Sequence, residues 1–362
     1  MNTLLELKAK FLARFGGEAD AIRVFYAPGR INLIGEHIDY NGGFVFPAAL
    51  TFGTTMLVRK RDDSTIQLAS ENFPLEVSAD LNDLSFRMED EWANYPKAML
   101  VHLQKRGVRF GGMDVMFDGA IPNGAGLSSS ASLLVASGYG FLKTAGHEPD
   151  KQEIALIAQE AENEYMGVNC GIMDQFSVAM GKQNHAILLK CDTLEFEYVP
   201  FQAEGYRIVI GNTNKRRGLV DSQYNLRRSQ CEQAVKELHA AFPELKQLAE
   251  LNMDQLKDHM HLFSHDDVRK RAEHVVAEND RVLQSVEALK NNDLAKFGQL
   301  MIGSHESLRD LYEVSCKELD VMVEEALKID GVLGSRMTGA GFGGCTVSLV
   351  KESSVDEFIR EV

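Results

Sequence analysis

The chain is poor in cysteine and has no long apolar run. Its five cysteines in 362 residues are an odd number, and no two lie close together. This spacing argues against a zinc site or a disulfide framework and fits a reducing cytosol. No apolar run approaches the ~20 residues of a membrane span. Residues 1–15 also lack the apolar core of a signal peptide, because basic residues interrupt them. We therefore expect a cytoplasmic protein that contacts no membrane, with residues 1–15 as a helix docked on its surface.

Positive charge is also in short supply. Lys and Arg number 38 against 53 Asp and Glu, which gives a net charge of −15 at pH 7. Such a field disfavours a nucleic-acid or anionic-membrane surface, so a nucleotide must be attracted by local groups. The hydrophobic fraction of 44% and the charged fraction of 25% are those of an ordinary globular protein. At the usual ~150 residues per domain, the length predicts two domains.

Strand-like and helix-like segments alternate in the first half of the chain. Alternating apolar patterns predict strands at 22–26, 54–58, 65–69, 114–117, 186–190, 207–210 and 345–350. Helical periodicity predicts helices over 131–142 and 150–166, and a charged helical region over 221–289 that is broken near Pro243. The pattern indicates a mixed α/β or α+β fold with a domain boundary between 180 and 210.

A glycine–serine segment, Asn123-Gly-Ala-Gly-Leu-Ser-Ser-Ser-Ala-Ser132, precedes the first of these helices. A glycine-rich loop at a helix N-terminus presents unpaired N–H groups and the positive end of the helix dipole to phosphate. It is not a standard P-loop, because no lysine follows the glycines. From this segment alone, a phosphate site and a helix cap without ligand remain equally open.

The segment Ala27–Gly43 places Arg30, Glu36, His37 and Asp39 between glycines after a strand. A small polyol needs such a set of donors and acceptors, because each hydroxyl must be matched to reject analogues. A polar surface loop is the alternative, and the density of functional groups favours a binding site.

Two single carboxylates are less informative by themselves. Asp174 lies in the mostly apolar segment Cys170–Phe176, where a helix N-cap is the favoured interpretation. With a rotation of ~100° per residue, Glu162 lies at the edge of the apolar stripe of helix 150–166. This position predicts a solvated side chain.

A second glycine cluster spans Ser335–Cys345 and contains a formal G-x-G-x-x-G match. The cluster leads into a strand and not a helix, which excludes a dinucleotide fingerprint. A protein-kinase loop is excluded because the sequence has no H-R-D or D-F-G. His259, His261 and His265 resemble a metal cluster, but their charged surroundings favour a solvated helix.

Together these segments resemble the GHMP kinase family and, within it, the galactokinases. Residues 29–43 resemble the galactokinase signature, 122–132 the phosphate loop, and 335–345 the third motif, while 170–176 and 219–228 resemble further galactokinase segments. The resemblance implies an α+β, two-domain GHMP kinase fold. A mixed-sheet N-terminal domain would span 1–195, a ferredoxin-like C-terminal domain would span 196–362, and the active site would lie in the cleft between them.

The resemblance also implies ATP-dependent phosphorylation of galactose at its C1 hydroxyl by a monomer. Asp174 matches the catalytic base, and Arg30 matches the arginine that stabilises the transition state. The residues that match galactose-binding positions are Glu36, His37, Ile38 (where threonine is usual), Asp39, Gly171 and Tyr224. The residues that match nucleotide-binding positions are Ser70, Gly124, Ala125, Gly126, Leu127, Ser128, Ser129 and Ser130. Ser130 and Glu162 match Mg²⁺ ligands.

Alternatives remain at this point. A kinase for a related sugar, such as N-acetylgalactosamine or arabinose, keeps the same motifs. Non-catalytic galactose sensors of the family have lost a Ser-Ala pair that is intact here as Ser130-Ala131, which favours an enzyme. Galactokinases usually continue into another strand after the third motif. We therefore expect an unpaired edge in the C-terminal sheet, and lower stability or an inactive product as its consequence.

Overall fold

The computed structural model describes residues 2–122, 124–215 and 220–362, and it divides into two compact units. Unit 1 contains Met1–Arg30, Leu50–Asn123 and Ser128–Met180, and unit 2 contains Ile31–Ala49, Gly124–Leu127 and Gly181–Val362. Asn123 of the glycine–serine segment and Leu219 of segment 219–228 lie outside the described residues. The domain boundary at 195/196 and the placement of the active site between domains stay predictions.

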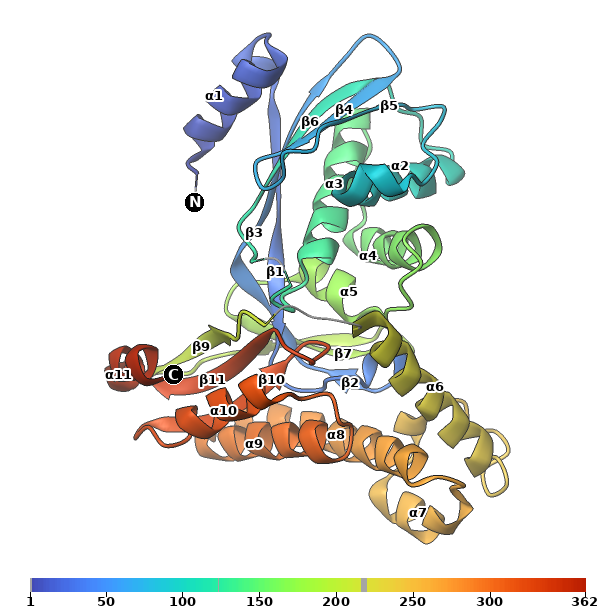
Figure 1. The fold of residues 1–362 in the computed structure, drawn as a ribbon, viewed down its shortest axis with the longest axis vertical. Coiled ribbons are helices and arrows are strands. Elements are labelled where there is room, and N and C mark those ends of the chain that lie inside the picture. The colour runs from blue at the N-terminus through green and yellow to red at the C-terminus, as the bar shows by residue number, and fades with distance from the viewer. Residues whose placement is uncertain (1, 123, 216–219) are drawn as a thin grey trace. The chain divides into compact units, whose positions relative to one another are not determined.

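Unit 1 is built on a mixed sheet with helices on both faces. Its strands are β1 (Arg23–Asn32), β3 (Pro47–Lys60), β6 (Met113–Gly119), β4 (Thr65–Ser70) and β5 (Val77–Asp80). β1 pairs with β3, β3 and β6 are antiparallel, β6 and β4 are parallel, and β4 and β5 are antiparallel. Its helices are α1 (Leu4–Phe15), α2 (Asn94–Lys105), α3 (Ser129–Ala145), α4 (Lys151–Glu160) and α5 (Met173–Met180). Figure 1 shows α2, α3, α4 and α5 on one face of this sheet and α1 on the other.

The predicted N-terminal helix is confirmed as α1. Thr3 and Glu6 form a capping box at its start, which satisfies two of the N–H groups that a helix end leaves unpaired. Leu7 and Phe11 are 3% and 0% exposed and pack in one cluster with residues of the sheet, such as Leu57. Burial of this apolar stripe fixes the helix on the sheet.

Unit 2 has a second, three-stranded antiparallel sheet in the order β10 (Val332–Thr338), β11 (Cys345–Lys351) and β9 (Tyr206–Asn212). Its other strands are β2 (Phe44–Val45), β7 (His185–Lys190) and β8 (Phe196–Pro200). Its helices are α6 (Val220–Leu238), α7 (Met253–Asp258), α8 (Asp266–Lys290), α9 (Leu294–Asp310), α10 (Lys317–Ala326) and α11 (Val355–Glu361). α8 and α9 lie along the three-stranded sheet (Figure 1). α9 approaches β10 through Gly298 and Gly334, where a Cβ on either glycine would meet the backbone of the facing segment.

All predicted strands are present, as β1, β3, β4, β6, β7, β9 and β11, and the predicted break near Pro243 falls between α6 and α7. The pattern missed the strands β2, β5, β8 and β10 and the helices α2, α9, α10 and α11. The glycines of the second cluster, between Thr338 and Cys345, form the β10–β11 hairpin loop, and the cluster leads into the predicted strand.

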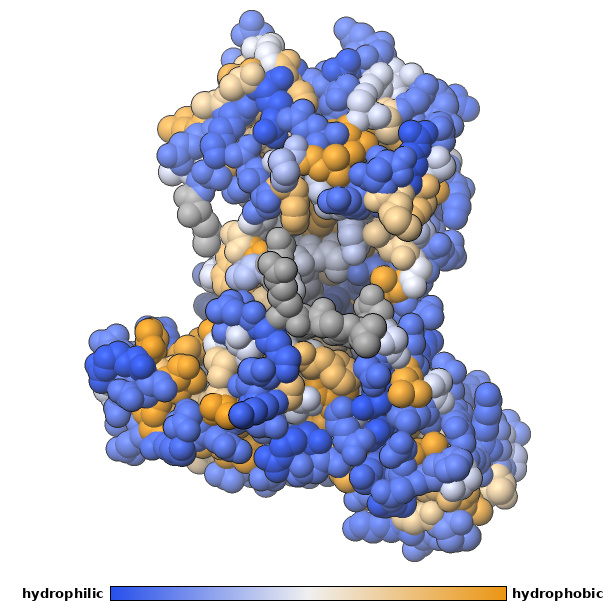
Figure 2. Space-filling model, viewed as in Figure 1, coloured by the Kyte–Doolittle hydropathy of each residue, from blue (hydrophilic) through white to orange (hydrophobic). Residues whose placement is uncertain are grey.

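The surface in Figure 2 is mostly hydrophilic, with scattered hydrophobic residues. Within the residues that the structure describes, no helix has the length and apolarity to cross a membrane.

Candidate active site

Arg30 and Asp174 form an ion pair in unit 1. Arg30 Nη2 and Nε donate to the same oxygen, Asp174 Oδ1, over 2.6 and 2.9 Å. The arginine side chain is 4% exposed, and the aspartate side chain is 32% exposed. A buried guanidinium thus holds a carboxylate that solvent or a ligand can reach. The structure brings together the two residues predicted to be catalytic.

Asp174 is not the helix N-cap that its segment alone favours. α5 begins at Met173, so Asp174 is the second helical residue. Its carboxylate bonds to Arg30, which is 144 residues away in sequence. The N-cap interpretation was wrong because the short segment contains no information on this distant cation.

Glu162 is buried, with 6% exposure, and the predicted solvated side chain is wrong. The reason is local: after Glu160 the helix changes from α to a π-helical turn over Ala161–Tyr165. The extra residue per turn rotates the following side chains from the positions that 100° per residue assigns, and such turns are frequent at functional sites.

Glu162 lies in a setting that disfavours its charge. Burial, and next the negative charge of Asp174, raise its pKa from 4.5 to about 7, while hydrogen bonds from Ser130 and Gln175 act in the opposite direction. Gln175 Nε2 donates to Glu162 Oε2 over 2.7 Å. A cation beside Glu162 and Asp174 would relieve the desolvation and the repulsion.

The donor set fits a hard divalent cation. Ser130 and Glu162 supply a hydroxyl and a carboxylate, the oxygen ligands that Mg²⁺ prefers. Buried Ser128 Oγ and Gln175 Oε1 have no hydrogen-bond partner among the described residues. The residues that the structure describes contain no group of three or more His, Cys, Asp or Glu side chains arranged to hold a metal by themselves. A metal here would therefore keep sites for water or phosphate oxygens.

The N-terminus of α3 is suited to an anion. Its N-cap residue, Ser128, is left-handed with φ 61°, and no side chain of the described residues caps the helix. The first turn also has no acidic residue. Its N–H groups and the positive dipole end are left for a ligand. In the loop before it, Gly124 and Gly126 have φ of 70° and 75°, which favours glycine.

An aromatic pocket in unit 1 contains Ser70 and two phosphate-loop serines. Its lining residues are Thr54, Ser70, Asn72, Phe73, Trp92, Tyr95, Phe117, Gly119, Ile121, Ser129, Ser130 and Leu133. The rings of Phe73 and Trp92 are stacked, with centroids 6.5 Å apart and 16° between planes. Flat apolar walls beside helix-terminal serines suit a base attached to phosphates. Sequence reasoning found Ser70, Ser129 and Ser130 here but missed the aromatic walls.

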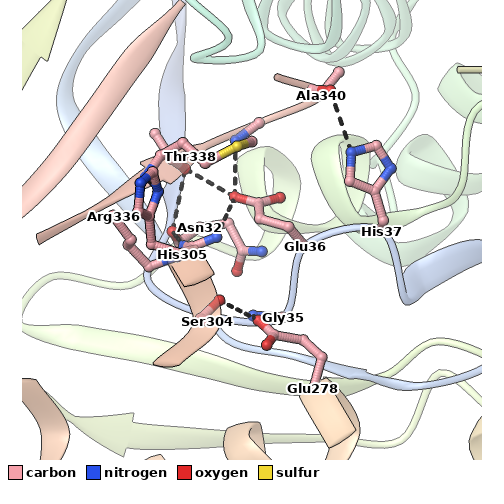
Figure 3. Close-up of polar contacts among 12 residues, drawn as sticks. Asn32, Gly35, Glu36, His37, Glu278, Ser304, His305, Arg336, Thr338 and Ala340 are labelled. Atoms are coloured by element: carbon pink, nitrogen blue, oxygen red, sulfur yellow. Dashed lines mark hydrogen bonds and ion pairs between the residues drawn. The ribbon is translucent and has the colours of Figure 1, made fainter. Parts of the chain in front are cut away.

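The predicted sugar-binding segment lies in unit 2. Glu36 is 1% exposed. Its Oε1 accepts hydrogen bonds from Thr338 Oγ1 (2.9 Å) and from the N–H of Gly339 (2.8 Å), and Arg336 Nη2 lies 3.2 Å away (Figure 3). No hydrogen bond from the described residues reaches Oε2. One oxygen is therefore fully committed to the protein.

His37 is held as a neutral ring. Burial, and next the nearby His274, lower its pKa from 6.5 to about 3. Its Nε2 lies 3.2 Å from the carbonyl oxygen of Ala340, to which it donates, and its Nδ1 lies 2.9 Å from the Tyr40 hydroxyl. Both ring nitrogens are therefore engaged by groups of the protein. The Tyr224 ring packs 5.5 Å from that of His37.

The remaining predicted site residues differ in exposure. Asp39 begins a 3-10 turn and is partly exposed. Ile38 is 0% exposed, so its side chain packs in the core. Gly171 is buried just before α5. The histidines that resemble a metal cluster do not lie on one helix, because His261 lies in a 3-10 turn and His265 precedes α8.

Comparison with known proteins identifies the family of this chain. Residues 9–60 match the galactokinase galactose-binding signature, residues 94–182 match the GHMP kinase N-terminal domain, and residues 285–362 match the C-terminal domain. The galactokinase of Clostridium tetani is 49% identical over 99% of this chain and 91% of its own length. The chain belongs to the galactokinase family. The galactokinase of Bacillus subtilis is 48% identical over 99% of this chain and 92% of its own length.

Solved structures give the fold. The galactokinase of Lactococcus lactis, crystallised with galactose, aligns with a TM-score of 0.96 and 42% identity over 99% of this chain and 93% of its own. The mevalonate kinase of Methanococcus jannaschii aligns with a TM-score of 0.69 and 21% identity over 94% of each chain, which concerns the fold alone. The predicted GHMP kinase fold is confirmed.

Proposed function

We propose that this galactokinase-family chain transfers the γ-phosphoryl group of ATP to the C1 hydroxyl of α-D-galactose. The products are ADP and galactose 1-phosphate. The O1 oxygen attacks the γ-phosphorus, the bond to the ADP oxygen breaks, and the hydroxyl proton passes to Asp174. The ion pair between Arg30 and Asp174 is the observation that carries this proposal, because it joins the phosphoryl-stabilising cation to the proton acceptor.

Asp174 Oδ1 receives both Arg30 donors, so Oδ2 is the oxygen that takes the proton. The guanidinium balances negative charge on the carboxylate and on the transferring phosphoryl group. Phosphoryl transfer has a loose transition state, so proton removal is late and positioning contributes much of the catalysis.

A divalent metal is implied by kinase chemistry with ATP, and Mg²⁺ fits the oxygen donors present. Ser130 and Glu162 would hold it, and when bound it would neutralise charge on the β- and γ-phosphate oxygens. Burial raises the pKa of Glu162 to about 7, and the residue would give up its proton on binding the metal.

The nucleotide would lie against the N-terminus of α3. The residues assigned to its phosphates are Gly124, Ala125, Gly126, Leu127, Ser128, Ser129 and Ser130. Ser70 Oγ accepts from the N–H of Asn72 over 3.0 Å, so its own proton remains to donate to the nucleotide. Phe73 and Trp92 supply stacking surfaces for the base.

Galactose recognition is assigned to the polar segment of unit 2 and its neighbours. The residues proposed to contact the sugar are Glu36, His37, Asp39, Gly171 and Tyr224. Ile38 belongs to the same segment, with its side chain directed into the core. Each hydroxyl matched by such groups rejects an analogue that lacks it. We also propose that the protein acts as a monomer in the cytoplasm.

A coupled assay of ADP release with galactose, mannose and N-acetylgalactosamine tests the proposal. We expect turnover with galactose and little with the other two sugars. Faster turnover with N-acetylgalactosamine would assign the chain to a related sugar kinase, and the absence of ADP release with every sugar would contradict the enzyme assignment.

A further inference from the structure

Among the described residues, hydrogen bonds reach only one oxygen of the Glu36 carboxylate. Figure 3 shows Thr338 and Arg336 grouped around Oε1, while Oε2 points away from them. Thr338 Oγ1 and the N–H of Gly339 donate to Oε1 over 2.9 and 2.8 Å. Two directed donors on a single oxygen define the plane and the rotation of the carboxylate.

Arg336 supplies the compensating charge. Its side chain is 0% exposed, and Nη2 lies 3.2 Å from Glu36 Oε1. Its Nη1 donates to the carbonyl oxygen of Asn32 over 2.8 Å, which fixes the guanidinium. A buried carboxylate without such a partner would be costly, so the arginine stabilises Glu36 where solvent does not.

Residues of α8 also form hydrogen bonds with the backbone next to Glu36. The N–H of Gly35 donates to Glu278 Oε1 over 3.0 Å (Figure 3). His274 Nε2 lies 3.2 Å from the carbonyl oxygen of Glu36. Glu278 is itself held by Ser304 over 2.5 Å and by Arg281 over 2.7 Å. Glu36 stands between Gly35 and His37, whose φ values of 101° and 63° are left-handed. Main chain and side chain of Glu36 are thus fixed independently.

We propose that Thr338 and Arg336 are positioning residues for sugar recognition. They occupy Oε1 of Glu36 and present Oε2 as the acceptor for one galactose hydroxyl. This inference rests on the proposed function, in which Glu36 contacts the sugar. It adds that selectivity at this hydroxyl is set from the β10 strand, by residues that do not touch the sugar.

The experiment compares Thr338→Val with Thr346→Val. Thr346 lies on the adjacent strand β11, where it pairs with Met337 of β10. It is 1% exposed, and its hydroxyl has no hydrogen-bond partner among the described residues. Both changes remove a buried hydroxyl from the same sheet, but only Thr338 serves Glu36. The readouts are kcat, the KM values for galactose and ATP, and kcat/KM for galactose analogues that each lack one hydroxyl.

We expect Thr338→Val to raise the KM for galactose about tenfold, as for loss of a hydrogen bond to a charged group, without changing the KM for ATP. Thr338→Val should also discriminate less well between galactose and one deoxy analogue. Glu36→Gln should lose discrimination against that same analogue. Thr338→Ser, which keeps the hydroxyl, should restore the KM, and Thr346→Val should resemble the parent.

The outcomes separate the two proposals. If Glu36→Gln shows no hydroxyl-specific loss, Glu36 does not bind the sugar and the proposed role of the segment is wrong. If Glu36→Gln shows that loss while Thr338→Val behaves like Thr346→Val, the positioning role is overturned. Should Thr338→Val fail to fold, Arg336→Lys is judged by the same readouts, because a single ammonium cannot serve both Asn32 and Glu36.

Discussion

Arg30 directs two guanidinium nitrogens, Nη2 at 2.6 Å and Nε at 2.9 Å, at one oxygen of Asp174. The arginine is buried, and the aspartate is partly open. This arrangement fixes the carboxylate and leaves Oδ2 without a hydrogen bond from the described residues. A carboxylate held in this way is oriented for proton transfer before substrate arrives, which lowers the cost of orientation during the reaction.

Asp174→Asn should lower kcat by ~10²–10⁴, the usual range for loss of a general base. The amide keeps the shape of the side chain but accepts no proton, so the KM values should change little. Steady-state ADP release measures this. Asp62→Asn, at an exposed aspartate of unit 1, is the matched control and should turn over like the parent. Near-parental kcat in Asp174→Asn would remove Asp174 from the role of base.

Glu162→Gln should abolish metal-dependent turnover and stabilise the ligand-free protein at alkaline pH. The folded-state pKa of Glu162, about 7, exceeds the usual 4.5. Between these values the folded state keeps a proton that the unfolded state has lost, so this residue lowers stability as pH rises. The full penalty is roughly 3 kcal/mol above pH 7.

Thermal unfolding at pH 5 and pH 8, without nucleotide or metal, measures the effect. Glu162→Gln should gain Tm over the parent at pH 8 and little at pH 5. Glu164 lies on the same π-helical turn, and its side chain is 62% exposed. The control variant Glu164→Gln should therefore show no such gain in Tm. An equal Tm difference at both pH values would contradict the raised pKa.

Phe73→Ala should raise the KM for ATP about tenfold or more, since stacking of a base on an aromatic ring contributes ~1–3 kcal/mol. Phe73 is 37% exposed, so its loss should not unfold the protein. The KM for galactose should stay unchanged. Phe86→Ala removes another exposed ring of unit 1 that is outside the pocket and should leave both KM values as they are. A parallel rise in both variants would exclude a specific contact with the base.

Asp39→Ala should mainly damage discrimination between sugars. A site built to bind a hydroxyl rejects the analogue without it, because the protein group that would bond to the hydroxyl is left unpaired. We expect kcat/KM to fall strongly for galactose and much less for the analogue that lacks the contacted hydroxyl. Equal losses for both sugars, measured with deoxygalactoses, would count against this role.

The chemistry-bearing residues were predictable where the local pattern is dense. The glycine–serine loop, the polar segment around Glu36 and the β10–β11 glycine cluster each have a backbone or side-chain signature. Asp174 and Glu162 were not predictable from local pattern. The role of Asp174 depends on Arg30, 144 residues away, and the burial of Glu162 depends on a π-helical turn that periodicity does not contain.

The network behind Glu36 was also beyond local reasoning. Thr338 and Arg336 lie on β10, separated from Glu36 by 302 and 300 residues, and their contacts with Glu36 form only in the folded chain. The aromatic walls of the pocket come from Phe73, which follows β4, and from Trp92, which lies in the 3-10 helix Met88–Ala93 before α2, and no local motif marks either residue. Tertiary pairing, and not propensity, decides such positions.

Acid should destabilise the protein through buried neutral histidines. Burial is the main cause that lowers the pKa of His37 to about 3 and those of His274 and His305 to about 4. Between pH 6.5 and pH 4 the unfolded state binds protons that the folded state does not bind, so stability falls as pH falls. At pH 5 each histidine contributes a loss of about 2 kcal/mol.

His305→Asn, whose amide oxygen can still accept from the N–H of Met337, should therefore lose less stability than the parent between pH 7 and pH 5 in denaturant titrations. His147→Asn, at an exposed position, should follow the parent, and an unchanged acid dependence in His305→Asn would show that His305 titrates normally in the folded protein.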